Sequence, residues 1–562
     1  MKRKLRMLSL VLIATMAVGM LSGCGNKDAK KSTQSSESKS SQVQAESSES
    51  NNSQTQTGVS EEITADVTYP IKDAAPLSFY FIGCIGKTTA YTDYDSVPFF
   101  AGYEKNTGVE IEWQTKAEGT DNTTAINLVL QNEELPNIFI TEMDIAKRTE
   151  LYEDGLIYDL TDYLPQYAPD FWEYINLPEN AANKRAITNN DGRILAFPCV
   201  RESDFNITYT GPIIRKDWLD KLGLDMPVTL DDWEVVLKAF KENYGAYFSS
   251  ALSRFNSAGL ASGTGAYAST SFGLYVDNGE IKCANVQEEW KEMLTYLHRW
   301  YKEGLLDPDF GSLDDKSVRA KALSGECGIV YTATSQMSNI INDAELEGNG
   351  AEWVGLSYPR TAEGVATSYI QSACQTVNLT VSALVMTSCS EEELITAIKL
   401  LNYGFTEEGM IYLNFGEEGV SYEVAEDGSL KFTELLTKDE RGLATAMIDH
   451  TAMYGGFAGI QMEEFVVAKN PQAAVDAIYT WIDNTEAAEH IVPPYTRTSE
   501  EQTTYSDIAS VVKTYVSEMS LKFITGDESL ENFDKFVDTL YSYDLQKLLD
   551  SEQAVYDRFV NN

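Results

Sequence analysis

The sequence predicts an α/β fold whose core is a doubly wound parallel sheet. Residues 77–82 form a nearly continuous apolar run, which is typical of a strand buried on both faces. Residues 109–113 alternate apolar with acidic side chains, and residues 137–141 form a third strand-like run. Helical segments separate these runs, and strands that alternate with helices favour a parallel sheet. In such sheets a ligand binds at the carboxyl ends of the strands.

Two helices are expected between the first three strands. Residues 99–106 are predicted to form the first helix, which ends at Gly108 because glycine readily adopts the left-handed conformation after a helix. Residues 125–133 are predicted to form the second, and a nearby proline breaks it. The carboxyl ends of two strands therefore lead into the loops after Gly83 and Thr141, where we expect ligand-binding residues.

A second unit begins near residue 201 and has its own helix signals. Residues 215–222 are predicted to be helical and to end at Gly223. Thr229 has the chemistry of an N-cap for the next helix, whose apolar face is Trp233, Val236, Leu237 and Phe240. Two C-terminal helices are predicted from the apolar stripes Phe533, Phe536, Val537 and Leu540, then Leu545, Leu548, Leu549, Val555 and Phe559.

The chain starts with a secretory signal. A basic start precedes an apolar run over residues 7–20, followed by the small residues that mark a cleavage site. Residues 21–24, Leu-Ser-Gly-Cys, resemble a bacterial lipobox, which predicts a signal peptide over residues 1–23 and a diacylglycerol anchor on Cys24. The alternative is an ordinary signal with a chance cysteine.

Residues 24–68 are predicted to be the lipidated cysteine followed by a tether. This segment consists mostly of Ser, Gln, Asn, Thr, Glu and Lys, so it cannot bury enough apolar surface to fold. As a flexible coil it would span roughly 33–40 Å. Two acyl chains hold a protein stably on a membrane, whereas one chain binds only marginally.

Composition narrows the function of the remaining body. The 562 residues include 43 Lys and Arg against 86 Asp and Glu, a net charge of −43, which argues against nucleic-acid or anionic-surface binding. The 31 tyrosines suit sugars, whose rings stack on aromatic faces. Beyond Cys24 we expect mostly buried free thiols rather than a disulfide framework at the six remaining cysteines: Cys84, Cys199, Cys283, Cys327, Cys374 and Cys389.

Catalytic and metal-binding motifs are missing from the sequence. The three histidines, His298, His450 and His490, are far apart and lack metal-ligand spacing. There is no serine-nucleophile elbow and no P-loop, and the glycine-rich residues 263–268 lack a preceding strand. We therefore assign no catalytic residue, cofactor or metal. Acidic residues are too numerous for a glycosidase pair to be recognised or excluded.

The polar residues with the strongest binding signal follow predicted strands or flank the crossover between the two units. The first group is Tyr91, Tyr94, Thr141 and Glu142, and the second is Arg201, Glu202, Asp204, Asn206 and Tyr209. All can hydrogen-bond to a polar ligand in a cleft. The alternative is that they are solvated loop or hinge residues.

Three segments resemble a known family. They are residues 103–113, residues 213–233 with the run Ile-Ile-Arg-Lys-Asp-Trp-Leu-Asp-Lys-Leu-Gly, and residues 402–422 with Asn-Phe-Gly-Glu-Glu-Gly-Val-Ser-Tyr. Together they are similar to family 1 extracellular solute-binding proteins of bacterial ATP-driven importers, in the subgroup of large lipoproteins. The second segment carries most of the specificity.

The resemblance implies a two-lobe fold of the periplasmic-binding-protein type, each lobe a doubly wound sheet flanked by helices, with a hinge between the lobes. Both lobes are discontinuous: residues 69–200 plus 362–435 are expected in the first, and residues 201–361 plus 436–562 in the second. Residues 324–331 resemble a strand that leads into the interlobe cleft, which implies Tyr331 as a wall residue. A tyrosine that caps a buried strand is the alternative.

The resemblance also implies a function. A monomer on the extracellular face of a Gram-positive cell would capture an oligosaccharide by hinge closure and deliver it to the membrane permease of an ABC transporter. Arg201 and Arg215 leave an acidic sugar open. Two alternatives remain: a lipid-anchored glycosidase with two carboxylates about 5–9.5 Å apart, and a polysaccharide-binding scaffold with an exposed aromatic patch.

Overall fold

The structure is a computed structural model, and it describes most of the body of the chain. The described residues are 67–82, 91, 93–117, 119–132, 134–201, 203–255, 259–268, 270–368, 381–493 and 495–561. The predicted signal peptide, Cys24, almost the whole tether, the loop that starts at Gly83, and Glu202 lie outside these ranges. Cys84 and Cys374 also lie outside them.

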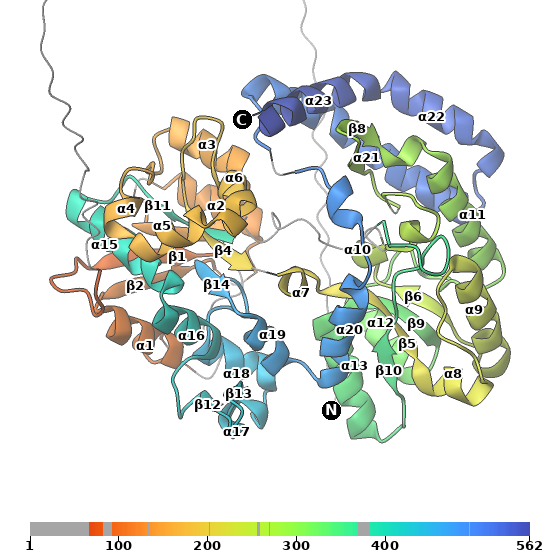
Figure 1. Ribbon diagram of the computed structural model, residues 1–562, viewed down its shortest axis with the longest axis horizontal. Helices are drawn as coiled ribbons and strands as arrows, with labels where there is room; N and C mark the ends of the chain where they lie inside the picture. The colour runs from red at the N-terminus through yellow and green to blue at the C-terminus, as the bar shows by residue number, and fades with distance from the viewer. Residues whose placement is uncertain are drawn as a thin grey trace, which may run out of the picture. The chain divides into compact units, whose positions relative to one another are not determined.

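The first lobe is built on a six-stranded sheet (Figure 1). Its order is β14 (Gly459–Gln461), β4 (Phe197–Arg201), β11 (Val381–Val385), β3 (Ile138–Glu142), β1 (Leu77–Phe81) and β2 (Ile111–Thr115). The three predicted strands are present within two residues of their expected bounds. The sheet is mixed rather than purely parallel, because β11 runs antiparallel to both of its neighbours, β3 and β4.

Helices pack around this first sheet (Figure 1). They are α1 (Pro98–Thr107), α2 (Asn122–Leu130), α3 (Ile145–Glu153), α4 (Leu164–Tyr167), α5 (Pro169–Asn176), α6 (Ala181–Ile187), α15 (Glu391–Asn402), α16 (Glu407–Phe415), α17 (Glu434–Thr437) and α18 (Leu443–His450), with the hairpin β12 (Tyr422–Val424) and β13 (Leu430–Phe432). Gly108 follows α1 with φ 74°, which confirms the predicted stop. Aromatic rings fill the core, where Phe79 stacks on Phe457 at 5.6 Å.

The second lobe is built on a four-stranded sheet. Its order is β10 (Trp353–Gly355), β5 (Thr210–Arg215), β9 (Cys327–Ala333) and β6 (Tyr247–Ser250). The hairpin β7 (Leu274–Asp277) and β8 (Glu280–Cys283) and ten helices accompany it among the described residues: α8 (Lys216–Leu222), α9 (Leu230–Tyr244), α10 (Leu252–Phe255), α11 (Glu288–Lys302), α12 (Asp315–Ser324), α13 (Thr334–Glu347), α20 (Gln472–Ile482), α21 (Ser499–Thr525), α22 (Phe533–Ser542) and α23 (Leu545–Asn561).

The helix signals of the second unit are confirmed. Gly223 ends α8 with φ 66°, and Thr229 forms a reciprocal capping box with Asp232 at the start of α9. The predicted apolar face of α9 is buried. In α22 and α23 the stripes are buried at Phe533, Phe536, Leu540, Leu545, Leu548 and Val555, while Val537, Leu549 and Phe559 are only partly buried.

The expected lobe boundary at residue 435 is wrong. Strand β14 pairs in parallel with β4, so the first lobe takes back a strand from the part expected in the second. Asn414 on α16 holds this strand: its amide donates to the Ile460 carbonyl at 2.8 Å, and its oxygen accepts from the Met462 amide at 3.0 Å. A three-residue strand that depends on a side chain so far away in sequence has no local pattern to reveal it.

Two described chain segments pass from the first sheet to the second lobe. One runs from β4 through the short helix α7 (Asp204–Ile207) into β5, and the other runs from β14 through α19 (Glu463–Lys469) into α20. Trp481 on α20 packs against β5, and its indole donates to the Pro212 carbonyl at 2.9 Å. The neighbouring Gly211 makes this contact possible, because a Cβ atom there would lie 2.3 Å from the indole ring.

Replacing Gly211 with alanine should destabilise the second lobe. The added methyl group would force Trp481 off β5, and overpacking of this kind costs about 1–3 kcal/mol. Urea unfolding of the mature chain, followed by tryptophan fluorescence, measures the loss. Gly311→Ala is the matched control, since a Cβ there would meet its nearest atom, on Leu521, at 3.8 Å. Equal stability of the two variants would contradict this account of the contact.

Candidate ligand-binding site

The carboxyl edge of the first sheet collects three of the predicted binding residues. Strands β1, β2, β3, β4 and β14 all run in the same direction, so their carboxyl ends share one edge. Thr141 and Glu142 end β3, and Arg201 ends β4. Arg201 is paired with Gln461, the last residue of β14. The sheet therefore brings Thr141, Glu142 and Arg201 to the side where a ligand of this fold class binds.

The two crossings leave this edge side by side and are bonded to each other. Ser203 caps α7 by accepting from the Asn206 amide, and its hydroxyl donates to Glu463 on α19 at 3.2 Å. The side chain of Asn206 donates to the Gln461 carbonyl at 2.8 Å. Asp204, the first residue of α7, is exposed. Of the predicted crossover residues, Asn206 therefore has a clear positioning contact.

The crossings are also anchored in the second lobe. The Tyr209 carbonyl accepts from the amide of Thr334 at 2.8 Å, just before β5 begins. Asn470, which follows α19, accepts from the Ser338 hydroxyl at 2.9 Å. Phe205 on α7 packs against Tyr479 on α20 with ring centres 4.8 Å apart. Both connections therefore have fixed ends in each lobe.

Several polar atoms at the edge and in the first crossing are buried without a partner in the described chain. They are Thr141 Oγ1, Arg201 Nε, Asn206 Oδ1 and Thr208 Oγ1. An unsatisfied buried polar group costs about 1–3 kcal/mol, so such groups are uncommon in a folded protein. Two hydroxyls, one guanidinium N–H and one amide oxygen offer both donors and acceptors to a polar ligand.

The two predicted tyrosines after β1 make other contacts. Tyr94 packs edge-on against Phe81 at 5.7 Å and Phe100 at 5.2 Å, so its ring belongs to the aromatic core near the end of β1. Tyr91 is half-buried, and its pKa is raised by burial and by the nearby carboxylate of Asp449. The described contacts of these tyrosines do not include Thr141, Arg201 or Asn206, and the loop between β1 and Tyr91 lies outside the described residues.

Tyr331 is an interior residue rather than an exposed wall residue. It lies in β9 opposite Pro212 and is 1% exposed. Its ring centre is 6.2 Å from that of Tyr358. The wall position implied by the family resemblance is therefore corrected: β9 is covered on both faces, and the tyrosine packs within the core, as the structural alternative predicted.

A basic side chain that the sequence did not single out lies near Arg201. Lys469, at the end of α19, is half-buried, and its ammonium lies 5.6 Å from the ring centre of Tyr454 and 4.9 Å from that of Phe465. Burial and, to a smaller extent, the nearby charge of Arg201 together lower the pKa of Lys469 to about 8. A single lysine at a helix C-terminus is common in sequences, which is why it carried no signal.

Arg215, the other arginine considered for an acidic ligand, has a structural role. Its guanidinium donates twice to Asp217, at 2.8 and 2.9 Å. The same group lies over the Trp218 ring at 4.1 Å and near the Trp353 ring at 5.7 Å. The side chain is therefore held between two tryptophans and a carboxylate, away from the sheet edge.

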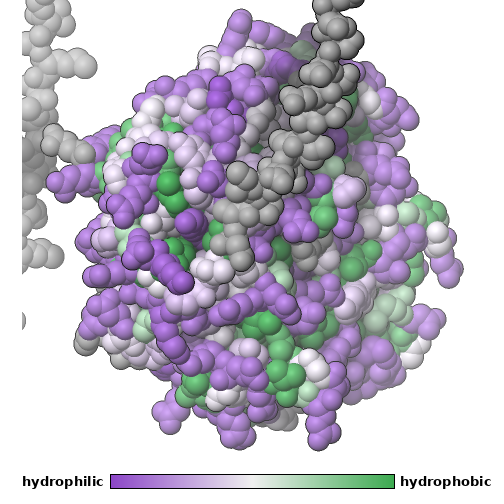
Figure 2. Space-filling model, turned by 60° about the vertical axis from the view of Figure 1, so that its left-hand side comes forward, coloured by the Kyte–Doolittle hydropathy of each residue, from purple (hydrophilic) through white to green (hydrophobic). Residues whose placement is uncertain are grey.

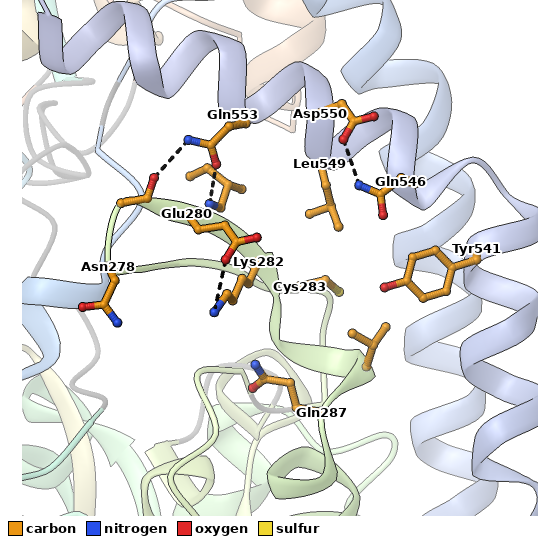
Figure 3. Close-up of a pocket in the computed structure, with 13 residues that line it drawn as sticks. Asn278, Glu280, Lys282, Cys283, Gln287, Tyr541, Gln546, Leu549, Asp550 and Gln553 are labelled. Carbon is orange, nitrogen blue, oxygen red and sulfur yellow. Dashed lines mark hydrogen bonds and ion pairs between the residues drawn. The ribbon is translucent and has the colours of Figure 1, made fainter.

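Several cavities lie elsewhere in the described chain, and two of them are formed by segments that are distant in sequence. One of about 480 Å³ lies between the β7–β8 hairpin and α22–α23, where Gln553 holds the hairpin by accepting from the Ile281 amide and donating to the Gly279 carbonyl (Figure 3). Another, of about 650 Å³, is lined by residues 144–153, 189–191 and 496–502. Neither includes the side chains at the carboxyl edge named above.

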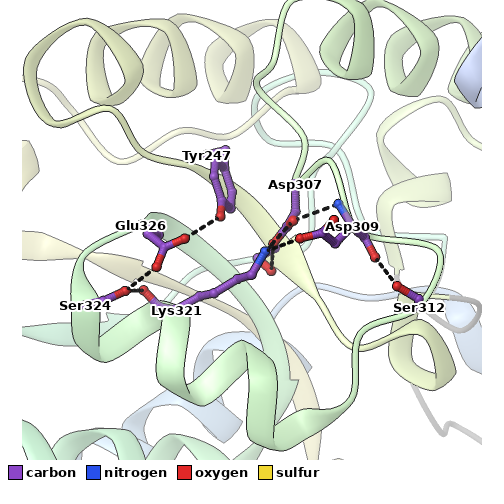
Figure 4. Close-up of polar contacts among 8 residues, drawn as sticks. Tyr247, Asp307, Asp309, Ser312, Lys321, Ser324 and Glu326 are labelled. Carbon is purple, nitrogen blue, oxygen red and sulfur yellow. Dashed lines mark hydrogen bonds and ion pairs between the residues drawn. The ribbon is translucent and has the colours of Figure 1, made fainter.

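The most deeply buried carboxylates are engaged in ion pairs. Asp307, which is fully buried, accepts from Lys321 at 2.8 Å, next to the Tyr247–Glu326 hydrogen bond (Figure 4). Asp449 pairs with Arg441 at 2.9 Å, and Glu552 pairs with Arg497 at 2.6 Å. These carboxylates hold elements together, and the described residues contain no group of three or more His, Cys, Asp or Glu side chains able to hold a metal.

The described surface is mainly hydrophilic on the face shown in Figure 2, where apolar residues form small groups. The large aromatic side chains counted as exposed are tyrosines: Tyr244, Tyr479, Tyr541 and Tyr543. Four described cysteines, Cys199, Cys283, Cys327 and Cys389, are buried free thiols as expected. No helix among the described residues is both long and apolar enough to span a membrane.

Comparison with known proteins gives a consistent result. Residues 88–411, more than half of the chain, match the family described as bacterial extracellular solute-binding protein. Lipoprotein LipO of Bacillus subtilis (strain 168) is 25% identical over 397 residues, covering 66% of this chain and 72% of LipO. The polygalacturonan/rhamnogalacturonan-binding protein YtcQ of the same strain is 24% identical over 443 residues, covering 77% of this chain and 82% of YtcQ.

One further relative matches over a shorter stretch of sequence, and a solved structure shares the fold. The fructooligosaccharide ABC transporter substrate-binding protein FusA of Streptococcus pneumoniae serotype 4 (strain ATCC BAA-334 / TIGR4) is 26% identical over 284 residues, covering 47% of this chain and about half, 51%, of FusA. The crystal structure of the alginate-binding protein AlgQ2 superposes with a TM-score of 0.68 at 20% identity, covering 88% of this chain and all of that one. The predicted two-lobe α/β fold is thereby confirmed.

We expect Lys469 to titrate at a lower pH than an ordinary lysine, because of its position in the fold. Its folded-state pKa lies near 8, below the ordinary 10.5, so between these values the unfolded chain binds more protons and folding stability rises with pH. In ¹³C NMR spectra of the dimethylated lysines, one resonance should titrate near pH 8 and vanish in Lys469→Gln. Arg201→Gln should raise this pKa, whereas the exposed control Arg185→Gln should not. A lysine at position 469 that titrates normally would refute the assigned environment.

Proposed function

Because this chain belongs to the family of bacterial extracellular solute-binding proteins, we propose that it captures an oligosaccharide and delivers it to the membrane permease of an ABC importer. The observation that carries the proposal is the carboxyl edge of the first sheet. There, unsatisfied donors and acceptors meet at the point where two bonded crossings lead to the second lobe. A sugar, which is rich in hydroxyls, matches this mixture of donors and acceptors.

The mechanism proposed is closure of the two lobes around the cargo. The crossings at residues 201–210 and 461–472 act as the hinge, and both are short and well anchored. Ligand bound to the edge of the first lobe gains further contacts when the second lobe closes, and only such extra contacts shift the equilibrium towards the closed form. The closed form would then be the state that the permease recognises.

The relatives support a carbohydrate as the cargo. FusA and YtcQ carry names that refer to a fructooligosaccharide and to polygalacturonan/rhamnogalacturonan. A glycosidase is the weaker candidate, since the buried carboxylates Asp307, Asp449 and Glu552 are paired with cations. A polysaccharide-binding scaffold is also weaker, because the large exposed aromatic residues of the described chain are four tyrosines, one in α9, one in α20, one in α22 and one just after α22.

We propose that Cys24 anchors the protein to the extracellular face of a Gram-positive membrane. The signal and the lipobox-like residues 21–24 support this, as does the similarity to a protein named a lipoprotein. The polar residues up to 68 would hold the binding lobes away from the lipid surface. The protein is proposed to act as a monomer without a cofactor or nucleic-acid partner.

An oligosaccharide cargo should stabilise the folded protein. At 100 times its dissociation constant a ligand adds about 2.7 kcal/mol, which a thermal-shift assay of the mature Cys24→Ser chain detects. The panel contains neutral and acidic oligosaccharides, amino acids and short peptides. A shift with a glycan and no product by chromatography is expected. Turnover of the glycan would support the glycosidase instead, and a shift only with peptides would exclude a sugar cargo.

The orphan hydroxyl of Thr141 should contribute to affinity but not to stability. Thr141→Val removes a hydroxyl that has no partner in the described chain, so the melting temperature should be unchanged or higher. The glycan found by the screen should bind about 3–10-fold more weakly by calorimetry. Thr149→Val is the control, because that hydroxyl bonds to the Ile145 carbonyl in α3. Unchanged affinity in Thr141→Val would remove Thr141 from the site.

Cys24→Ala should release the protein from the membrane. Without the cysteine no diacylglycerol can be attached, and the described chain has no membrane-spanning helix. In a Gram-positive host, fractionation and immunoblotting should show the wild type in membranes and the variant in the medium or uncleaved. Cys84→Ala provides the cysteine-removal control. Mature, membrane-bound Cys24→Ala protein would contradict lipidation at this residue.

A further inference from the structure

The two lobes also meet away from the crossings. Asn190, in the turn that follows α6 of the first lobe, donates from its side-chain amide to the Thr496 carbonyl of the second lobe at 3.2 Å. The guanidinium of Arg185 on α6 lies 5.8 Å from the ring centre of Phe559 on α23. We call these four residues the interlobe contact. They lie on elements that take no part in the two described crossings.

The second lobe holds its half of the interlobe contact in place. The Thr496 carbonyl also accepts from the Arg558 guanidinium of α23 at 3.3 Å. The ring centre of Phe559 lies 6.5 Å from that of Tyr495, in an edge-on arrangement. The Tyr495 hydroxyl in turn donates to the buried carboxylate of Glu552 at 2.7 Å. The acceptor and the ring are therefore fixed before the first lobe reaches them.

The first lobe holds its half in the same way. The side-chain oxygen of Asn189 accepts from the backbone amides of Asp191 and Arg193, at 3.1 and 2.9 Å, which fixes the turn that carries Asn190. Arg185 lies in the last turn of α6. Because both halves are built into ordered elements, the contact forms without the entropy cost of ordering a loop.

A polar cavity of about 650 Å³ separates the lobes beside the interlobe contact. Helix α3 and the turn at residues 189–191 line it from the first lobe, and residues 496–502 line it from the second. Of its 14 lining residues, Ala146 is the one with an apolar side chain. Asp144, which also lines the cavity, caps α3 directly after β3. The cavity therefore begins next to the carboxyl edge of the first sheet.

This composition makes the contact reversible. Asn190 and Arg185 stay exposed while they make it, and the facing walls are hydrophilic, so parting the lobes here exposes little apolar surface. A net hydrogen bond shifts an equilibrium about 2–10-fold, and a cation over a ring at an exposed site shifts it about 2–5-fold. Contacts of this size favour one arrangement of the lobes without locking it.

From this arrangement we propose that the interlobe contact is a latch, which stabilises the closed form and sets the balance between closed and open forms. The inference rests on the closure mechanism of the proposed function and adds to it residues that determine affinity without touching the cargo. Affinity for a cargo that binds the closed form rises with the fraction of protein already closed. Asn190 and Arg185 therefore act as positioning residues for capture.

The test follows the separation of the lobes by single-molecule fluorescence energy transfer in the mature Cys24→Ser chain, with no cargo added. The dyes are attached to ketone-bearing amino acids that replace Glu173 on α5 and Lys547 on α23, both of which are exposed. We expect the ratio of the high-transfer to the low-transfer form to fall about 2–10-fold in Asn190→Ala and about 2–5-fold in Arg185→Ala.

Matched variants distinguish the contact between lobes from local effects. Lys184→Ala removes a cation that lies 5.6 Å from the ring centre of Trp172 within the first lobe, and Asn176→Ala removes a side-chain hydrogen bond within α5. Neither should change the ratio. In a double-mutant cycle, Arg185→Ala and Phe559→Leu should have less than additive effects, because both remove the same contact. Thermal melts confirm that each variant folds.

Each outcome bears on the latch alone. A drop in the high-transfer form in the Arg185→Ala/Asn190→Ala double variant, but not in the controls, supports the assignment. An unchanged distribution in the double variant would overturn it, as would an equal change in the controls. Because no cargo is present, a glycan screen without a hit does not affect the measurement, and a refuted latch leaves oligosaccharide capture standing.

Discussion

The hydrogen bond from the Asn206 side chain to the Gln461 carbonyl joins the two described crossings between the lobes. These crossings start from neighbouring strands, since Arg201 is paired with Gln461. Because they are bonded at their origin, one cannot bend without moving the other. The polar groups next to this bond, Arg201 and Asn206 among them, are therefore held in one arrangement. In the proposed closure of the lobes, such a fixed base would keep the binding groups together.

The charged and polar groups of the lobes differ in their partners from those at the crossings. Elsewhere in the described lobes, buried charges serve the fold, as in the Lys321–Asp307 and Arg497–Glu552 pairs. In the described part of the first crossing, Arg201 Nε, Asn206 Oδ1 and Thr208 Oγ1 are buried without a hydrogen-bond partner, at a cost to stability. Polar groups without a hydrogen-bond partner are expected at sites where a protein binds a ligand, because such sites are not optimised for stability alone.

Local chemistry explains which parts of the fold were predictable. Gly108, Gly223 and Thr229 mark helix ends through their own backbone or side-chain preferences, so the sequence located those helices. Strand β14 has three residues and depends on Asn414, which lies 45 positions before it. No local sequence pattern therefore indicates that the chain returns to the first sheet at residues 459–461.

The candidate site divides in the same way. Thr141, Glu142 and Arg201 were predictable because strand ends in a parallel arrangement share an edge. Lys469 was not, since its lowered pKa comes from burial and from the charge of Arg201, which is distant in sequence. Tyr331 lies in β9, a strand that the sequence predicted correctly, but the burial of both faces of β9 depends on helices far away in the sequence.

The strand order of the first sheet also has a consequence for biogenesis. Strand β11 lies between β3 and β4, so β4 cannot join the sheet until residues 381–385 have been synthesised. The N-terminal third of the chain therefore cannot complete its lobe early, which favours the unfolded, threadable state that passage through a narrow export channel requires.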